Sequence, residues 1–435
     1  MSPDAGPPLL RVERALRLLP DVDVLAPLRA FLVSTSRVRP GSEPYRTVGK
    51  RFVHPAHLRE LAPRAAARVK DYLDSLYGAA VDALDAEQRG NPSGIVEALV
   101  RAGETEERAG RASQAHIWYT HALGIAEELH DRHPEIHALH HLGLLEAARD
   151  RFHEAARFHQ RCLALAAAEL DGESAAAACL GLGQVELEQT RLQGATAWFR
   201  RGLEQAGGET ALAAFLRLGL ADVARLKRDL DTAAQQLKES RDLFERLSHA
   251  EGMARALEAG GRIESLRGEP AAAMSAHREA LARLHGNGLH ARLELDIRLS
   301  LAELCLEWDR LRDAEDELRQ AEETAIVHNL TRSLVRLYSI MGELRGRQLD
   351  DTGFVFFEKA IELCRGPEPL PRLEAQTYVA YAQFRERFGD AAESTAYYER
   401  AREIFEMTGD ADATTRIEAR LAAAQTGDTA AERPS

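Results

Sequence analysis

The sequence is poor in the residues that build disulfide frameworks and β-sheets. It contains 4 cysteines and 6% aromatic residues in 435 positions, and it has no Cys-x-x-Cys pair. Valine, isoleucine and threonine are sparse beside alanine, leucine, arginine and glutamate. Strand formers are therefore scarce and helix formers plentiful. Four scattered cysteines make no disulfide framework, so we expect a reducing compartment and a cytoplasmic protein.

Long apolar runs are also absent. Even the apolar stretch TALAAFLRLGLADVARL is interrupted by Arg217, Asp222 and Arg225. Because a membrane-spanning helix needs about 20 mostly apolar residues, the pattern predicts no membrane insertion. No uncharged apolar segment precedes a cleavage site near the N-terminus, so no signal peptide is expected. The net charge of -13 disfavours general nucleic-acid binding.

The usual signatures of enzymes are missing as well. The chain has no His-Glu-x-x-His zinc motif, no phosphate-binding loop of the type G-x-x-x-x-G-K-[ST], and no nucleophile elbow. The cysteines stand in register with small core residues, which favours packing over reactivity. We therefore expect no catalysis, no cofactor and no metal.

A pattern of small, large and small residues recurs along the chain. In the copy RDRFHEAARFHQRCLALA, Ala155, His159 and Cys162 stand at offsets 0, 4 and 7, which lie on one helical face. Successive copies are separated by 40, 40, 38, 40, 41, 39 and 41 residues. The first small positions are Ala115, Ala155, Ala195, Ala233, Ala273, Ala314, Gly353 and Ser394.

A second small position precedes each of these by twelve residues. Glycine inside a helix costs about 1 kcal/mol relative to alanine, so repeated glycines here indicate a close helix–helix crossing. Turn-like pieces such as RDRFH and KRDLD separate the two small positions, and each unit is predicted as helix, turn, helix. The second small positions are Gly103, Gly143, Gly183, Ala221, Gly261, Ala302, Met341 and Ala382.

The repeated unit resembles the tetratricopeptide repeat family, whose pattern L-G-x-x-Y, then A-x-x-x-F, then A is matched by LGLLEAARDRFHEAARFHQRCL and YAQFRERFGDAAESTAYYERA. The spacing near 40 residues marks the long-unit type, since the basic unit has about 34. The resemblance implies an all-α, right-handed α-solenoid of about eight repeats over residues 94–409.

The ends of the chain are expected to differ from the repeats. Residues 410–425 are predicted to form a capping helix, and residues 426–435 a disordered tail. Residues 1–90 read as an N-terminal extension with short helices, an irregular basic segment and a long helix over 63–89. Docking of the basic segment on an acidic surface, including this chain's own solenoid, is favoured over nucleic-acid binding.

In the tetratricopeptide family the first helices of successive units line a concave groove. When the positions of these groove-lining residues are carried over to the present sequence, Glu258, Asp296 and Glu303 fall on the groove face. A basic or amphipathic peptide or helix would fit such a groove, although the same residues could be ordinary polar helix faces. The groove residues proposed as partner-binding are His137, His140, Leu144, Leu180, Gln184, Phe215, Leu218, Asp222, Arg225, Arg255 and Arg262.

Histidines crowd into one part of the chain. Seven of the 16 lie between His130 and His159. His137 and His141 are four residues apart, so both could reach one ion from a helix. A polar surface that titrates near pH 6.5, or no special role, are the other interpretations.

These observations predict a protein–protein interaction scaffold or adaptor that holds a peptide or helix in the groove. A regulatory sensor, whose superhelix responds to a peptide or small ligand, is the alternative. A metal-dependent enzyme based on the histidines is a more remote one. Self-association is compatible with the sequence, which does not identify the partner.

Overall fold

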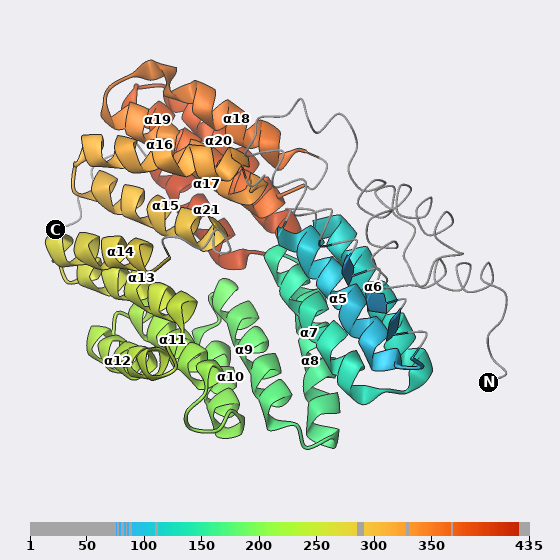
Figure 1. Cartoon of the computed structure of the whole chain (residues 1–435). Helices are drawn as coiled ribbons and strands as arrows, with labels where there is room; N and C mark the ends of the chain where they lie inside the picture. The colour runs from blue at the N-terminus through green and yellow to red at the C-terminus, as the bar shows by residue number, and fades with distance from the viewer. Residues whose placement is uncertain are drawn as a thin grey trace, which may run out of the picture. The chain divides into compact units, whose positions relative to one another are not determined.

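The computed structural model describes residues 89–108, 112–284, 291–327, 330–366 and 369–425, with scattered helical residues between 75 and 86. All regular structure in these ranges is helical (Figure 1). The expectations for the N-terminal segment before residue 75 and for the tail 426–435 lie outside the described residues. The helices of the first hairpins are α5 Pro92–Arg108, α6 Ala112–Leu129, α7 Arg132–Ala148, α8 Phe152–Ala168, α9 Gly172–Glu188 and α10 Leu192–Gln205.

The remaining helices continue the alternation to the end of the described chain. A short 3-10 turn, η4 Asp351–Gly353, precedes α18. The helices are α11 Ala211–Leu226, α12 Leu230–Arg246, α13 Ala250–Leu266, α14 Pro270–Leu284, α15 Ala291–Glu307, α16 Leu311–Val327, α17 Thr331–Arg347, α18 Phe354–Cys364, α19 Pro371–Arg387, α20 Ala391–Thr408 and α21 Ala411–Gln425.

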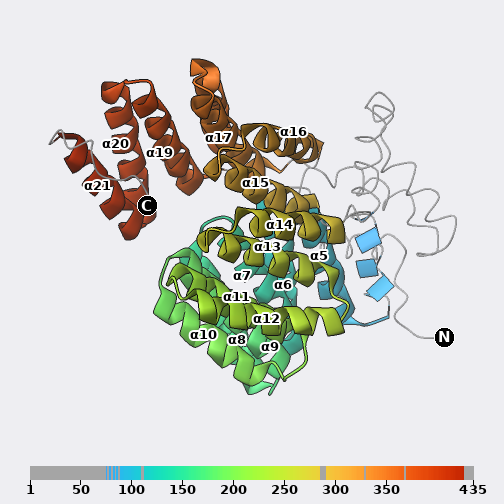
Figure 2. The same ribbon diagram turned by 90° about the vertical axis from the view of Figure 1, so that its left-hand side faces the viewer.

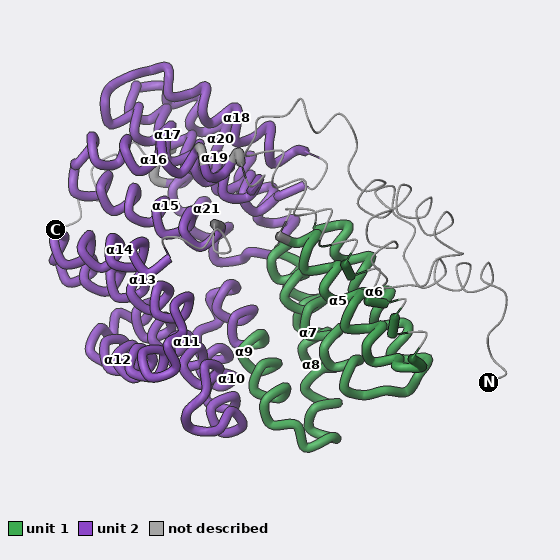
Figure 3. The backbone as a smooth tube through the Cα atoms, viewed as in Figure 1, with its two compact units in different colours: residues 1–182 green, residues 183–435 purple. Residues whose placement is uncertain are grey.

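The chain divides into two compact units, residues 1–182 and 183–435, and the boundary falls inside α9 (Figure 3). In unit 1, α5 pairs with α6 and α7 pairs with α8. In unit 2, the pairs α11–α12, α13–α14, α15–α16, α17–α18 and α19–α20 follow one another in chain order (Figure 2). We call the first helix of each hairpin the A helix and the second the B helix. The predicted fold class, all-α with helical hairpins stacked in sequence, is confirmed.

Most of the described turns between helices share one backbone conformation. One residue adopts the left-handed conformation, for example Asp150 with φ 60° and Thr190 with φ 57°. The next N–H then donates back to a carbonyl five residues earlier, as from Arg151 to Glu146 at 2.9 Å and from Arg191 to Glu186 at 2.8 Å. This closes the exposed end of the preceding helix. Because the same short turn recurs, successive hairpins keep nearly the same length.

The two small positions of the repeat meet inside each hairpin. The eight residues at the first small position are all buried. A Cβ added at Gly183 of α9, or at Gly219 of α11, would lie less than 3.0 Å from the ring of Phe199 on α10. The glycines therefore make room for the large residue of the motif, as the pattern predicts.

One predicted small position is wrong. The spacing assigns it to Met341, but this side chain is half-buried, and Gly342 is the residue that approaches the ring of Phe357. This shift of one residue coincides with η4. The first small position of the motif, Gly353, is the last residue of the 3-10 turn, whereas in other hairpins the same position already lies in the α-helix. A 3-10 turn rises about 2.0 Å per residue instead of 1.5 Å, which changes the register locally.

Helix α21 covers the last hairpin. Ala413 and Ile417 join the core formed by Tyr398, Phe405 and neighbouring residues of α18 to α20. The opposite side of α21 carries exposed polar residues, among them Arg416. One apolar and one polar face is the arrangement that a terminal solenoid helix requires.

Candidate binding surface

The A helices form the inner face of unit 2. Successive A helices contact one another along the series α11, α13, α15, α17 and α19. The B helices α12, α14 and α16 make no comparable contact with each other in the described ranges. The A layer is thus the more closely packed, and a stack of hairpins curves toward its closer layer. We refer to the A-helix side of unit 2 as the inner face.

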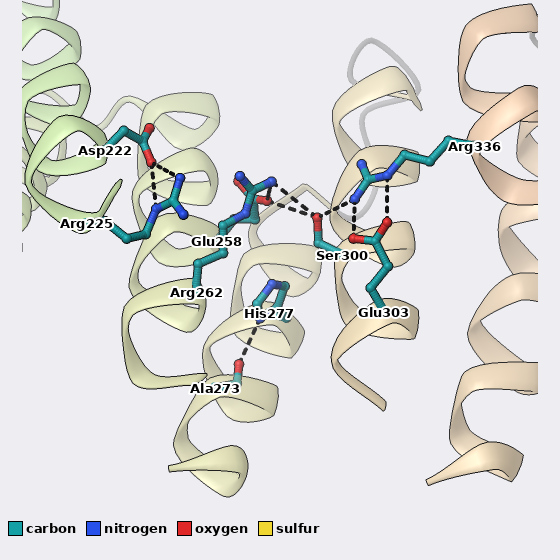
Figure 4. A network of polar contacts seen from close by, with 9 residues as sticks. All are labelled: Asp222, Arg225, Glu258, Arg262, Ala273, His277, Ser300, Glu303 and Arg336. Carbon is teal, nitrogen blue, oxygen red and sulfur yellow. Dashed lines mark hydrogen bonds and ion pairs between the residues drawn. The ribbon is translucent and has the colours of Figure 1, made fainter. Parts of the chain in front are cut away.

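Ser300 is the centre of a polar network on the inner face (Figure 4). This buried residue of α15 donates from Oγ to Glu258 Oε1 at 3.1 Å. Its hydroxyl oxygen accepts hydrogen bonds from Arg262 of α13 at 3.4 Å and from Arg336 of α17 at 3.3 Å. Glu258 and Arg262 also form an ion pair along α13. One small hydroxyl therefore links three consecutive A helices.

Further ion pairs extend the network at both ends. Arg336 holds both carboxylate oxygens of Glu303, at 3.0 and 2.6 Å. On α11, Arg225 Nε donates to Asp222 Oδ1 at 3.1 Å. The arginine side chains remain reachable from solvent, with exposed fractions of 18% for Arg225 and 31% for Arg336. The charged groups are thus held in fixed positions by their ion pairs.

The pKa values of two groups in the network, Asp222 and Arg336, are shifted from their ordinary values. Burial raises the pKa of the Asp222 carboxyl, although Arg225 and Arg262 act in the opposite direction. Burial acts to lower the pKa of the Arg336 guanidinium, but Glu303, Asp296 and Glu258 raise it overall. The carboxylates thus hold the guanidinium charge firmly in place.

His277 of α14 lies beneath the network (Figure 4). Only 2% of this residue is exposed, and its Nδ1 lies 2.8 Å from the carbonyl oxygen of Ala273. Because a carbonyl can only accept, Nδ1 carries the proton and Nε2 is an acceptor, which has no hydrogen-bond partner. Burial lowers the pKa of His277, so the ring is neutral at neutral pH.

The other side of α13 carries a separate cleft of about 310 Å³. Leu257, Gly260 and Glu264 face it, and these residues are rotated away from Glu258 and Arg262 around the helix. The cleft is therefore distinct from the inner-face network. The residues that line it are Ala234, Leu237, Lys238, Arg241, Asp242, Glu245, Met253, Leu257, Gly260, Ile263, Glu264, Ala276 and Arg283.

The histidines of unit 1 gather between α7 and α8. The ring of His140 lies 5.8 Å from that of His141 and 5.8 Å from that of His159, and His137 lies 4.9 Å from His141. His159 is fully buried and both of its ring nitrogens lack hydrogen-bond partners.

Burial is the main cause of the low pKa values in this group. It lowers the pKa of His137, and it lowers the pKa of His140 and His141 to about 4 and that of His159 to about 3. These rings are neutral at neutral pH. No group of three or more histidine, cysteine or acidic side chains in the described ranges is arranged to hold a metal ion.

The structure brings together some of the predicted groove residues. Asp222, Arg225 and Arg262 belong to the inner-face network, and Arg255 lies close enough to act on the pKa of Asp296. Leu218 is buried. Phe215 is half-buried, with its ring 4.8 Å from Phe244 and 5.6 Å from His249.

The other predicted groove residues lie outside this network. His137, His140, Leu144 and Leu180 lie in unit 1, whereas Gln184 is exposed at the start of unit 2. The groove register did not include Ser300 or Arg336, because their role depends on which helix faces which, and the repeat motif placed His277 only as the large residue four positions after Ala273.

No helix in the described part of the chain is long and apolar enough to cross a bilayer. The four cysteines are free and buried, and burial raises the pKa of Cys162 to about 12, of Cys305 to about 11 and of Cys364 to about 12. Such thiols are poor nucleophiles at neutral pH. The expectation that they fill packing positions agrees with this burial.

The chain has a tetratricopeptide-like repeat fold. No family model matches the sequence, and no curated protein matches it either. Among solved structures, a Rap protein complexed with Competence and Sporulation Factor is 11% identical, with a TM-score of 0.48, over 76% of this chain and 98% of that one. A tetratricopeptide repeat protein from Parabacteroides merdae is 13% identical, with a TM-score of 0.41, over 70% and 99%.

A third similar structure covers more of this chain. It is a signal transduction ATPase with numerous domains and a tetratricopeptide repeat sensor from Pyrococcus horikoshii, 14% identical with a TM-score of 0.46, over 92% of this chain and 72% of that one. At these identities the likeness says nothing about what this chain binds.

Proposed function

We propose that the chain is a non-catalytic interaction protein whose inner face in unit 2 binds a peptide or helix of a protein partner. The observation that carries the proposal is the polar network of Ser300, Glu258, Arg262 and Arg336, built from three successive A helices. The charges are partly exposed and fixed in ion pairs, as suits a surface that recognises a polar chain.

The test is selection of a random dodecapeptide display library against the full chain. Reversing two charges of the network, Arg262→Glu with Arg336→Glu, removes their pairing with Glu258 and Glu303 and should abolish retention of the selected peptides. Arg319→Glu is the matched control, because Arg319 is 72% exposed on the B helix α16. Circular dichroism checks that each variant is folded. Retention unchanged by the double reversal would exclude the inner face as the binding surface.

Phe215→Glu is unsuitable for this test, although Phe215 is a predicted groove residue. Its ring packs against Phe244 and His249, so a buried carboxylate would disrupt α11 and α12 whether or not a peptide binds. Loss of binding in that variant would not distinguish unfolding from a blocked surface.

A sensor is the second candidate, and two long-range polar contacts favour it. Arg372, at the start of α19, donates to the carbonyl oxygen of Glu188 at 2.8 Å and lies 3.2 Å from Asp410. Thr190 likewise donates to Asp412. These contacts join parts of unit 2 that are 184 and 222 residues apart, whereas solenoid repeats usually touch only their neighbours.

Surface polar contacts contribute only about 0–1 kcal/mol each, and Thr190 and Asp412 are exposed, so a bound peptide that changes the curvature of unit 2 could open these contacts. The sensor hypothesis expects a selected peptide to increase the radius of gyration measured by small-angle X-ray scattering. It also expects Arg372→Ala to reproduce that increase without peptide. A radius of gyration unaffected by either change would leave only the adaptor function.

A further inference from the structure

Asp296 differs from the other acidic residues of the inner-face network. Asp222, Glu258 and Glu303 are each in an ion pair with one arginine. Asp296, half-buried on α15, has one polar contact, a hydrogen bond from Ser333 Oγ of α17 at 3.4 Å. Within the described ranges no arginine, lysine or histidine side chain lies within ion-pair distance of its carboxylate.

The charged groups around Asp296 are mostly engaged elsewhere. Arg336 is held by both oxygens of Glu303, and Arg255 pairs with Glu251 at 3.0 Å. Arg292, exposed one turn earlier on α15, acts on Asp296 from a distance. Glu258 is close enough to act in the opposite direction. Burial outweighs the arginines and raises the pKa of the Asp296 carboxyl, so its negative charge is under-compensated in the free protein.

The ring of His277 beneath the network adds no positive charge. The Nε2 atom of His277 is buried, unpartnered and uncharged, and the groups that act on its ring include Glu258, Arg262 and Glu303 of the same network. Asp296 therefore has no ion-pair partner in the described ranges, while both guanidinium groups of the network nearby are already paired. A positively charged hydrogen-bond donor fits this imbalance, and an anion does not.

We propose that Asp296 receives the ammonium or guanidinium group of a lysine or arginine in a peptide bound across α13, α15 and α17. This inference rests on the proposed peptide-binding function. The incoming cation replaces the missing ion-pair partner of Asp296 and lies within the field of Glu258. The carboxylate thus selects basic peptides, while the paired arginines position the rest of the chain.

The test uses dodecapeptides selected from the random display library on the wild-type chain. We expect them to share a lysine or arginine at one aligned position. Replacing that residue by norleucine should weaken binding about tenfold, and Asp296→Asn should weaken binding of the unmodified peptide by a similar factor. Norleucine peptide and Asp296→Asn together should give no further loss. Asp316→Asn is the matched control, since Asp316 is 64% exposed on the B helix α16.

The outcomes separate the inference from the function on which it rests. If no peptide is selected, the proposed function fails and the inference with it. If peptides are selected but show no basic position, or if the two changes weaken binding additively, peptide binding stands and the role of Asp296 is overturned. Thermal unfolding gives a further readout. If the Asp296 carboxylate serves only to bind the peptide, Asp296→Asn should be at least as stable as the wild type at neutral pH. A marked loss of stability would assign the carboxylate a structural role instead.

Discussion

Replacing His159 by phenylalanine should stabilise unit 1. The His159 ring lies between Gly143 and Gly181, and an added Cβ at either glycine would lie less than 3.0 Å from it. Phe199 occupies the equivalent slot of the next hairpin between Gly183 and Gly219, so the slot accepts a phenyl ring. His159 leaves two buried nitrogens unpaired, and each unpaired buried polar group costs about 1–3 kcal/mol. Allowing for imperfect repacking, we expect a gain of about 1–3 kcal/mol in the free energy of unfolding.

The gain in the free energy of unfolding from His159→Phe should increase at acidic pH. The folded-state pKa of His159 is lowered by burial from 6.5 to about 3, so the unfolded chain binds a proton at higher pH than the folded chain. Wild-type stability is therefore retained above pH 6.5 and lost as the pH falls toward about 3. At about pH 5 the proton bound by the unfolded chain adds roughly 2 kcal/mol to the advantage of His159→Phe.

Urea unfolding followed by circular dichroism, at neutral pH and at about pH 5, measures both effects. His153→Gln is the control, because His153 is exposed on the same helix and should change stability by less than about 0.5 kcal/mol. A His159→Phe protein that is less stable than wild type at both pH values would refute the reasoning, since it would mean that the nitrogens are satisfied or that the slot is too narrow for phenyl.

Three further changes test the backbone and the core. Leu170→Gly should raise stability by about 1 kcal/mol in chemical denaturation, because Leu170 has φ 56° and is 92% exposed, so strain is relieved and no packing is lost; an unchanged midpoint would contradict this. Gly183→Ala should lower stability by about 1–2 kcal/mol through its clash with Phe199, whereas Gly124→Ala, with open space around it, should raise stability by up to about 1 kcal/mol; equal effects would refute the close-crossing argument. Native protein should react with a thiol reagent such as Ellman's only on unfolding, because all four cysteines are buried; rapid reaction of one thiol in the folded state would disprove it.

The repeat pattern predicts most of the fold because helical hairpins are local structures. The eight first small positions are buried as expected, and His159 and Phe199 fill the large positions between glycines. The one failure, Met341 in place of Gly342, occurs where η4 changes the register. Fixed sequence spacing assumes an unbroken α-helical turn, and it does not detect a local 3-10 segment.

The inner face was only partly predictable from the register. Asp222, Arg225 and Arg262 follow from their positions on the A helices, and each has a partner within four residues on its own helix. The central role of Ser300 does not follow, because its partners Glu258 and Arg336 lie 42 and 36 residues away. Phe215 is half-buried and its ring contacts Phe244, a contact that the register does not foresee. Both results depend on the rotation of each helix about its axis.

The sequence by itself determined that this protein is built of helical hairpins repeated about every 40 residues, because helix propensity and the spacing of small residues act within one hairpin. Only the tertiary structure decided which charges are paired. Glu303 of α15 pairs with Arg336 of α17, whereas Asp296 of the same helix has no ion-pair partner in the described ranges, and this difference depends on how neighbouring helices pack. Since burial and ion pairing both act through space, the unpaired carboxylate becomes visible only when α13, α15 and α17 are placed side by side.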